Sequence, residues 1–260
     1  MATEHISAAW KAYKRNLWDI IASVIVMGII VAVPLLIAFV PLLFAIGNSI
    51  TTVGLLSSPT TFNQVLISAL VSNIPVLILT VIFFIIAMLV AMALNAGFTK
   101  VIYDSLKGRA RVDTMINVAR KKFWTIIGAN LLVTALALLA FMVIVVPIAL
   151  VSFVATLNVA VSTIFFILGT IVWILIVITF GFVDQAIVID NFTAVDAVKH
   201  SVKVVRKNYL DLLALILVFF FINIVLLFIP IVGSIVISFV TAPLAILAYT
   251  SLYVKRKRSR

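Results

Sequence analysis

Three long stretches without a single charged residue constrain this chain more than any other feature of its sequence. They cover residues 20–99, 123–183 and 212–254, which are 80, 61 and 43 residues long. About 20 apolar residues span the roughly 30 Å hydrocarbon core of a bilayer, and backbone exposed to lipid must satisfy its polar groups within the segment. Each stretch is too long for one transmembrane helix and predicts two.

Polar, turn-forming residues divide each uncharged stretch. The breaks fall at residues 48–61, near 156–158 and at 230–234, where Asn, Ser, Thr, Gly and Pro gather. The sequence therefore predicts six membrane helices, at about residues 19–47, 64–96, 125–154, 159–183, 210–230 and 234–254.

Composition excludes the other broad classes of protein. Hydrophobic residues make up 65% of the 260 residues and charged residues 10%, against about 45–50% and 25% in soluble domains. The chain is too apolar to be water-soluble and too rich in aliphatic residues to be disordered. It has no cysteine, and therefore no disulfide framework and no thiolate metal site.

The basic residues lie in four patches between and around the uncharged stretches. The patches are Lys11–Arg15, Lys100–Lys122, Lys199–Lys207 and Lys255–Arg260. Six spans place both termini and both charged connections on one side of the membrane, and the positive-inside rule makes that side cytoplasmic. We expect a multi-pass plasma-membrane protein with cytoplasmic termini.

A threefold internal repeat follows from aligned segments that each precede a membrane helix. Residues 14–21 (KRNLWDII) align with 120–127 (RKKFWTII) and with 206–213 (RKNYLDLL). The same register places apolar stripes with helical spacing upstream of each segment. The stripes are Ile6/Trp10/Tyr13/Leu17, Val112/Ile116/Ala119/Phe123 and Val198/Val202/Val205/Tyr209.

The predicted fold is an all-α polytopic membrane bundle of six transmembrane helices, built from three repeats of a cytoplasmic amphipathic helix and a transmembrane hairpin. We expect a single integral membrane domain over residues 1–260. Its repeat units cover about residues 3–96, 97–183 and 184–254, followed by a basic tail at 255–260. Thr193 to Asp196 read as a capping-box variant that opens the third amphipathic helix.

Three segments carry a resemblance to a known group of proteins. They are Ala197 to Leu213, Gly97 to Arg109, and Pro243 with Tyr249 to Lys257. With them the chain resembles the membrane domain of glycerophosphoryl diester phosphodiesterases and related uncharacterised six-helix families of bacteria and archaea. The resemblance implies a six-helix architecture. The catalytic residues of those phosphodiesterases belong to a separate soluble domain with no counterpart in these segments, so no catalytic residue is carried over.

A few polar residues are candidates for a role inside the membrane. Asn95, Asn130 and Asn223 each require a hydrogen-bond partner, which is either a neighbouring helix or a substrate or water pathway. Asp19, Thr125 and Asp211 occupy aligned positions at the starts of membrane helices, where they favour helix capping. A proton or ion site is the alternative for the two aspartates.

The basic residues beside the membrane are the candidate contacts for anionic lipid headgroups, which attract nearby Lys and Arg by about 1 kcal/mol each. These candidates are Lys14, Arg15, Arg120, Lys121, Lys122, Arg206, Lys207, Lys255 and Arg256. We prefer lipid to nucleic acid as the partner, because these residues flank membrane helices. An unidentified membrane protein is a further possible partner.

The sequence favours a non-enzymatic membrane protein that binds lipid, organises the membrane or stabilises a partner. The alternative is a transporter or pore for a small neutral or amphiphilic solute, since repeats are common in transporters. An intramembrane enzyme ranks third, because a nucleophile requires an adjacent base and no histidine or carboxylate lies deep in the predicted helices. We expect no catalytic residue, no metal and no cofactor.

Overall fold

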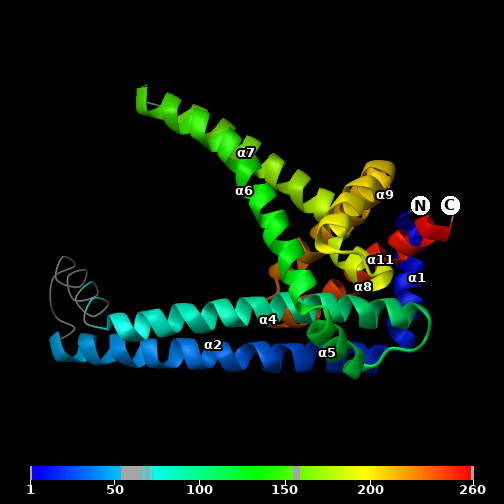
Figure 1. Cartoon of the computed structure of the whole chain (residues 1–260), viewed down its shortest axis with the longest axis horizontal. Coiled ribbons are helices and arrows are strands. Elements are labelled where there is room, and N and C mark those ends of the chain that lie inside the picture. Colours follow the sequence, from blue (N-terminus) through cyan, green and yellow to red (C-terminus); the bar gives the residue numbers. More distant parts are fainter. Residues whose placement is uncertain (1, 54–66, 68–70, 72, 155–158, 259–260) are drawn as a thin grey trace. The chain divides into compact units, whose positions relative to one another are not determined.

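The computed structural model describes residues 2–53, 67, 71, 73–154 and 159–258. Within these ranges the chain is all-α, as predicted, with one π-helical turn (Figure 1). The elements are α1 (Ala2–Arg15), α2 (Leu17–Val53), α4 (Ile74–Leu106), α5 (Val112–Lys121), α6 (Phe123–Val154), α7 (Val159–Phe180), α8 (Val183–Asp190), α9 (Ala194–Leu227), α10 (Val232–Val236), the π-helix η1 (Ile237–Thr241) and α11 (Ala242–Arg258).

Six helical segments in the described ranges are long and apolar enough to cross a membrane, so the chain is a multi-pass membrane protein. They are Leu17–Ala45, Ile74–Leu106, Phe123–Val143, Ile167–Asp190, Ala194–Leu227 and Val232–Lys255. Several boundaries differ from the sequence prediction, and the fourth span, for example, extends past residue 183 to Asp190. α4 continues past residue 96 to Leu106, and α9 begins at Ala194 because the amphipathic segment runs directly into the membrane helix.

The predicted breaks have different outcomes. The third is confirmed, since α9 ends at Leu227 and α10 begins at Val232. A Cβ on Gly233 would lie 1.8 Å from the carbonyl oxygen of Leu226, so this turn requires glycine. α2 extends through the start of the first predicted break to Val53, because no Gly or Pro interrupts residues 48–53. The rest of that break, and the break near 156–158, lie outside the described residues.

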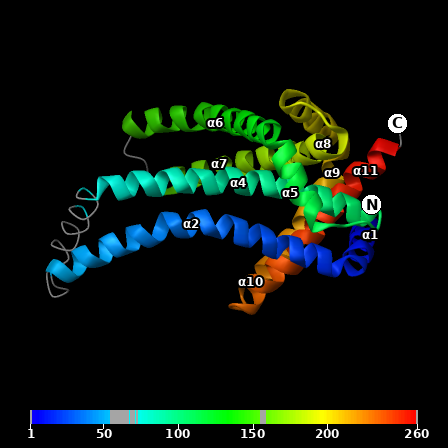
Figure 2. The same cartoon turned by 60° about the horizontal axis from the view of Figure 1, so that its bottom comes forward.

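The chain divides into two compact units. Unit 1 comprises Met1–Val24 and Ala93–Arg260, and unit 2 comprises Ile25–Met92. In unit 2, α2 and α4 run side by side in both views (Figure 2). The Thr80 hydroxyl of α4 donates to the carbonyl oxygen of Ala38 on α2 at 2.9 Å, and the rings of Phe39 and Phe84 meet edge to face.

Small residues bring the helices of unit 1 close together. A buried cluster joins α4, α6, α8 and α9, and four of its members are alanines. The cluster comprises Ala96, Ile126, Ala129, Val183, Ala186, Ile187, Val188, Ala197 and Val198. Lipid tails are as apolar as these side chains, so close van der Waals packing at small residues holds the helices together.

Each predicted amphipathic segment forms a helix that packs on a membrane helix. α1 lies along α11 (Figure 1), and α5 crosses α4 so closely that a Cβ on Gly97 would lie 2.3 Å from the Met115 carbonyl oxygen. The first part of α9 packs on α8. These contacts place the amphipathic helices at the ends of the spans.

The buried face of α1 differs from the predicted stripe by about one position. His5, Ala9, Ala12 and Tyr13 are buried, whereas Trp10 of the predicted stripe is 43% exposed. The predicted face was therefore wrong in part. The small alanines allow α11 to approach more closely than a face of Ile and Trp would, and the sequence pattern does not indicate this partner.

Candidate functional site

Three junctions, where an amphipathic helix meets a membrane helix, form the candidate site. The first is Asn16, between α1 and α2, and the second is Lys122, between α5 and α6. The third is Asn208, whose φ of −130° and ψ of 23° interrupt α9. All three lie at the position that the sequence alignment treats as equivalent, so the chain changes direction at the aligned residue each time.

The first junction caps the end of α4. The Arg15 guanidinium donates to the carbonyl oxygens of Ser105 and Leu106 at 3.0 and 3.3 Å. Asn16 Nδ2 donates to Ser105 at 3.1 Å and to Ala12 at 3.0 Å. The last carbonyls of a helix have no partner within it, and a cation there also meets the negative end of the helix dipole. Arg15 therefore has a structural role.

The second junction caps the end of α8 in a similar way. Lys122 Nζ donates to the carbonyl oxygen of Ile187 and to Oδ1 of Asn191. Asn191 ends α8 in the left-handed region at φ 60°, which Asn tolerates better than most residues. Burial lowers the pKa of Lys122, and the charge of Lys100 lowers it further.

The third junction satisfies its buried amide within its own helix. Asn208 Nδ2 donates to the carbonyl oxygen of Val204 at 2.8 Å. About two turns earlier, the buried Ser201 hydroxyl donates to the Thr179 carbonyl at 2.9 Å and accepts from the Phe182 N–H at 3.2 Å. Ser201 thus joins α9 to the point where α7 ends and α8 begins.

An exposed apolar side chain stands two residues after each junction. Trp18, Trp124 and Leu210 are 79%, 81% and 78% exposed. A large apolar side chain with that exposure suits the boundary between headgroups and acyl chains, where Trp is enriched.

The predicted lipid contacts differ in exposure and in their partners. Seven are exposed: Lys14, Arg15, Arg120, Lys121, Arg206, Lys207 and Lys255. Of these seven, Arg15 bonds to the carbonyls described above and Lys255 pairs with Glu4 at 2.7 Å, whereas Lys122 is half-buried and bonds to the Ile187 carbonyl. Lys14 Nζ also lies 4.8 Å from the centroid of the Trp10 ring. The side chain of Arg256 lies outside the described part of the structure.

The three candidate intramembrane amides lie in different surroundings. Asn223 Oδ1 accepts from the Thr241 hydroxyl at 2.7 Å, which joins α9 to η1. Asn130 Nδ2 donates to Ile126 in its own helix at 2.9 Å. Asn95 is exposed on α4, and its backbone carbonyl accepts from the Thr99 hydroxyl at 3.2 Å. The structure therefore does not bring the three amides to one site.

Two of the candidate caps, Asp19 and Thr125, occupy the first turns of α2 and α6, whereas Asp211 lies inside α9, three residues after the interruption at Asn208. Asp19 is exposed, whereas Thr125 and Asp211 are half-buried. The predicted cap at Thr193 is confirmed, since its hydroxyl oxygen accepts from the Asp196 N–H.

Sequence reasoning missed the polar contacts that hold α1. His5 Nδ1 lies 3.1 Å from Ser251 Oγ, and the Tyr13 hydroxyl donates to the Phe239 carbonyl at 2.8 Å. Pro243, four residues after Phe239, has no N–H for that carbonyl, so this acceptor was a signal available in the sequence.

One family model matches the chain. This family is described as Domain of unknown function (DUF7847), and its model matches residues 41–256, which include the second and third junctions but not the first. No curated protein and no solved structure matches the chain. The resemblance to the phosphodiesterase membrane domain stays a prediction.

Proposed function

The chain belongs to the DUF7847 family of unknown function, and from that premise we propose that it is a non-enzymatic membrane protein that binds anionic lipid headgroups at its junctions. The exposed pairing of basic and apolar side chains carries this proposal. Lys14, Arg120 with Lys121, and Arg206 with Lys207 each precede an apolar residue that is about four-fifths exposed. The cations suit headgroup phosphates, and the apolar side chains suit the acyl boundary beneath them.

Within this proposal the chain consists of three repeat units with cytoplasmic junctions. Burial supports the repeat, because the aligned positions are buried together. These positions are Ala9/Met115/Ser201, Tyr13/Ala119/Val205, Ile20/Ile126/Leu212 and Ser23/Ala129/Leu215. The concentration of basic residues at the junctions supports their cytoplasmic location.

The surroundings of two intramembrane amides support lipid binding over solute transport. Asn130 and Asn223 have hydrogen-bond partners within the protein. A solute pathway would require such groups to face a cavity. Lipid binding and membrane organisation therefore remain our preferred role.

Native mass spectrometry of the detergent-purified protein with added phosphatidylglycerol tests lipid binding. A variant with Lys14, Arg120, Lys121, Arg206 and Lys207 changed to Gln removes the exposed junction charges other than Arg15, which caps α4. The matched control changes five other exposed basic residues to Gln, namely Lys11, Arg109, Arg111, Lys199 and Lys203.

We expect the junction variant to retain at least about tenfold less phosphatidylglycerol, since each removed charge is worth about 1 kcal/mol near the headgroups. The control should lose much less phosphatidylglycerol. The two variants should retain equal amounts of phosphatidylcholine. Equal losses in the two variants would attribute binding to bulk charge and contradict a junction site.

A further inference from the structure

The packing of α1 on α11 differs in connectivity from the other two contacts made by amphipathic helices. α5 follows its partner α4 after residues 107–111, and α9 follows α8 after residues 191–193. α1 has no such short connection to α11, because residues 16–241 separate the two helices along the chain. The described polar contacts that hold α1 here join His5 to Ser251 and Tyr13 to the Phe239 carbonyl, so α1 can separate from α11 without breaking a membrane helix.

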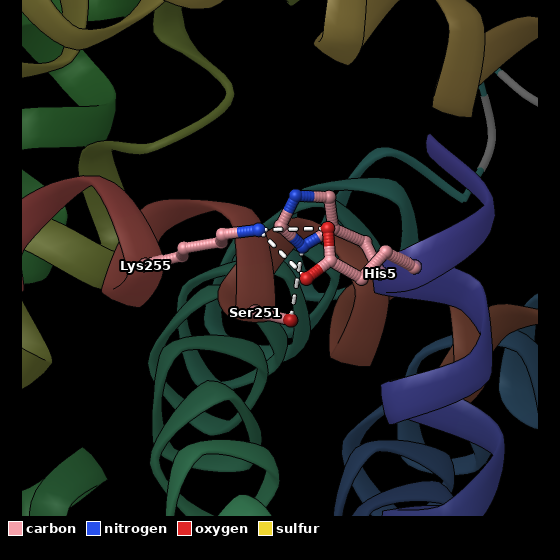
Figure 3. Close-up of polar contacts among 4 residues, drawn as sticks. His5, Ser251 and Lys255 are labelled. Carbon is pink, nitrogen blue, oxygen red and sulfur yellow. Dashed lines mark hydrogen bonds and ion pairs between the residues drawn. The ribbon is translucent and has the colours of Figure 1, made fainter. Parts of the chain in front are cut away.

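The contact contains one buried group that changes charge near neutral pH. His5 is 3% exposed, and its Nδ1 lies 3.1 Å from Ser251 Oγ. Figure 3 shows the His5 ring between α1 and α11, next to Ser251 and Lys255. Lys255 Nζ bonds to both carboxylate oxygens of Glu4 at 2.7 Å. A serine hydroxyl can donate or accept, so Ser251 bonds to either form of the ring.

The surroundings of His5 disfavour its charged form. Burial lowers the pKa of His5 below 6.5, and nearby positive charge, including that of Lys255, lowers it further. Glu4 on α1 and Asp211 on α9 act in the opposite direction without reversing the shift. A cation at this position would lose part of its hydration, and the attraction of Glu4 and Asp211 does not offset that loss.

We propose that the contact between α1 and α11 is a pH-sensitive latch, which neutral His5 holds closed and protonated His5 releases. The closed state binds fewer protons than the open state, so acid favours the open state. The latch is closed above the ordinary His pKa of about 6.5 and weakens as the pH falls below it. When α1 is released from α11, the exposed Trp10 and the basic residues of α1 would move with it.

Proton linkage limits the size of the effect. With an open-state pKa of about 6.5, the open-to-closed ratio rises by up to about tenfold between pH 7.5 and pH 5.5. A change of this size over two pH units is sufficient to detect opening by chemical labelling.

The cysteine-free chain allows a direct test of opening. A single cysteine replaces Ala9, which is fully buried beneath α11, and its labelling rate by a maleimide is measured at pH 7.5 and pH 5.5. Each rate is divided by that of Ser7→Cys, an exposed position on α1, so that the pH dependence of the thiolate cancels. Ala12→Cys, also buried, is a second reporter in case Ala9→Cys does not fold.

We expect the labelling ratio to rise severalfold, up to about tenfold, at pH 5.5. In a His5→Gln background, which keeps a hydrogen-bonding side chain but cannot be protonated, the ratio should stay constant. Ser201→Cys is buried at the position of α9 that aligns with Ala9, and its ratio should remain low at both pH values.

Three outcomes would overturn the proposal. One is a ratio that does not change with pH in the His5 chain. Another is an equal rise in the His5→Gln background, which would assign the change to another group. The third is a parallel rise at Ser201→Cys, which would indicate general unfolding rather than release of α1.

Discussion

The two compact units are held by different chemistry. In unit 1, cationic and amide side chains from the junctions cap the last carbonyls of α4 and α8. In unit 2, the described contacts between α2 and α4 centre on a threonine bonded to a carbonyl, two phenylalanine rings and small buried alanines. The last carbonyls of a helix require hydrogen-bond donors at that helix end. Apolar spans that pack side by side have no such requirement. The junctions therefore fix the arrangement of unit 1 more specifically than packing fixes unit 2.

The largest effect should come from the closest backbone approach in unit 1. Gly97→Ala places a Cβ 2.3 Å from the Met115 carbonyl oxygen, and α4 and α5 must separate to accommodate it. We expect a loss of about 3 kcal/mol, at the upper end for overpacking, measured by unfolding in a denaturing detergent. Gly28→Ala in unit 2 is the control, because nothing lies within 4 Å of its Cβ position. Equal effects at the two glycines would contradict the comparison.

The next effect should come from the cap at the second junction. Lys122→Met keeps most of the side-chain volume but leaves the Ile187 carbonyl without its cationic donor. We expect a loss of about 2 kcal/mol, because an acceptor that is left unsatisfied loses more than the net value of the bond. The neighbouring exposed Lys121→Met should change stability by less than about 0.5 kcal/mol. Thermal unfolding in detergent measures the stability of both variants. If Lys122→Met were as stable as the unmodified protein, the cap would be dispensable.

A smaller effect should come from the polar contact in unit 2. Thr80→Val removes the bond to Ala38 with little change in shape. Interhelical bonds of this kind contribute about 0.6 kcal/mol on average in membranes. Thr179→Val is the control, since the Thr179 hydroxyl bonds to Leu175 in its own helix. A loss at Thr80 as large as that at Lys122 would mean that unit 2 also depends on specific polar bonds.

The sequence predicted the places where the chain changes direction but not the partners of the residues there. The aligned segments placed Asn16, Lys122 and Asn208 in one register, and all three interrupt a helix. The aligned basic residues were interpreted as lipid contacts, yet Arg15 and Lys122 bond to backbone carbonyls. Every residue carries a carbonyl, so a sequence pattern cannot identify which one will accept.

The contact between α1 and α11 was unpredictable for a related reason. Helical periodicity identifies an apolar stripe, but it does not indicate whether lipid or another helix covers that stripe. Buried Ala9 and Ala12 favour a close helix partner, which is a property of packing rather than of hydrophobicity. The packing of α11 on α1 depends on the folded arrangement of two segments that are far apart in the sequence.

The smallest effect should come from the ion pair at the edge of the same contact. The Glu4 carboxylate and the Lys255 ammonium are 2.7 Å apart, but both side chains are more than half exposed, and exposed pairs contribute little. Lys255 lowers the pKa of Glu4 below its ordinary 4.5, so the stabilisation is present above pH 4.5 and is lost as the pH falls through the lowered value. We expect Glu4→Gln to lower the melting temperature slightly at pH 7, with no difference from the unmodified protein in strong acid or at high salt, where such pairs are screened. The latch depends on His5 rather than on this pair, so Glu4→Gln should leave the pH at which α1 opens almost unchanged. A large shift of that pH would assign the pH sensitivity to the carboxylate instead of the imidazole.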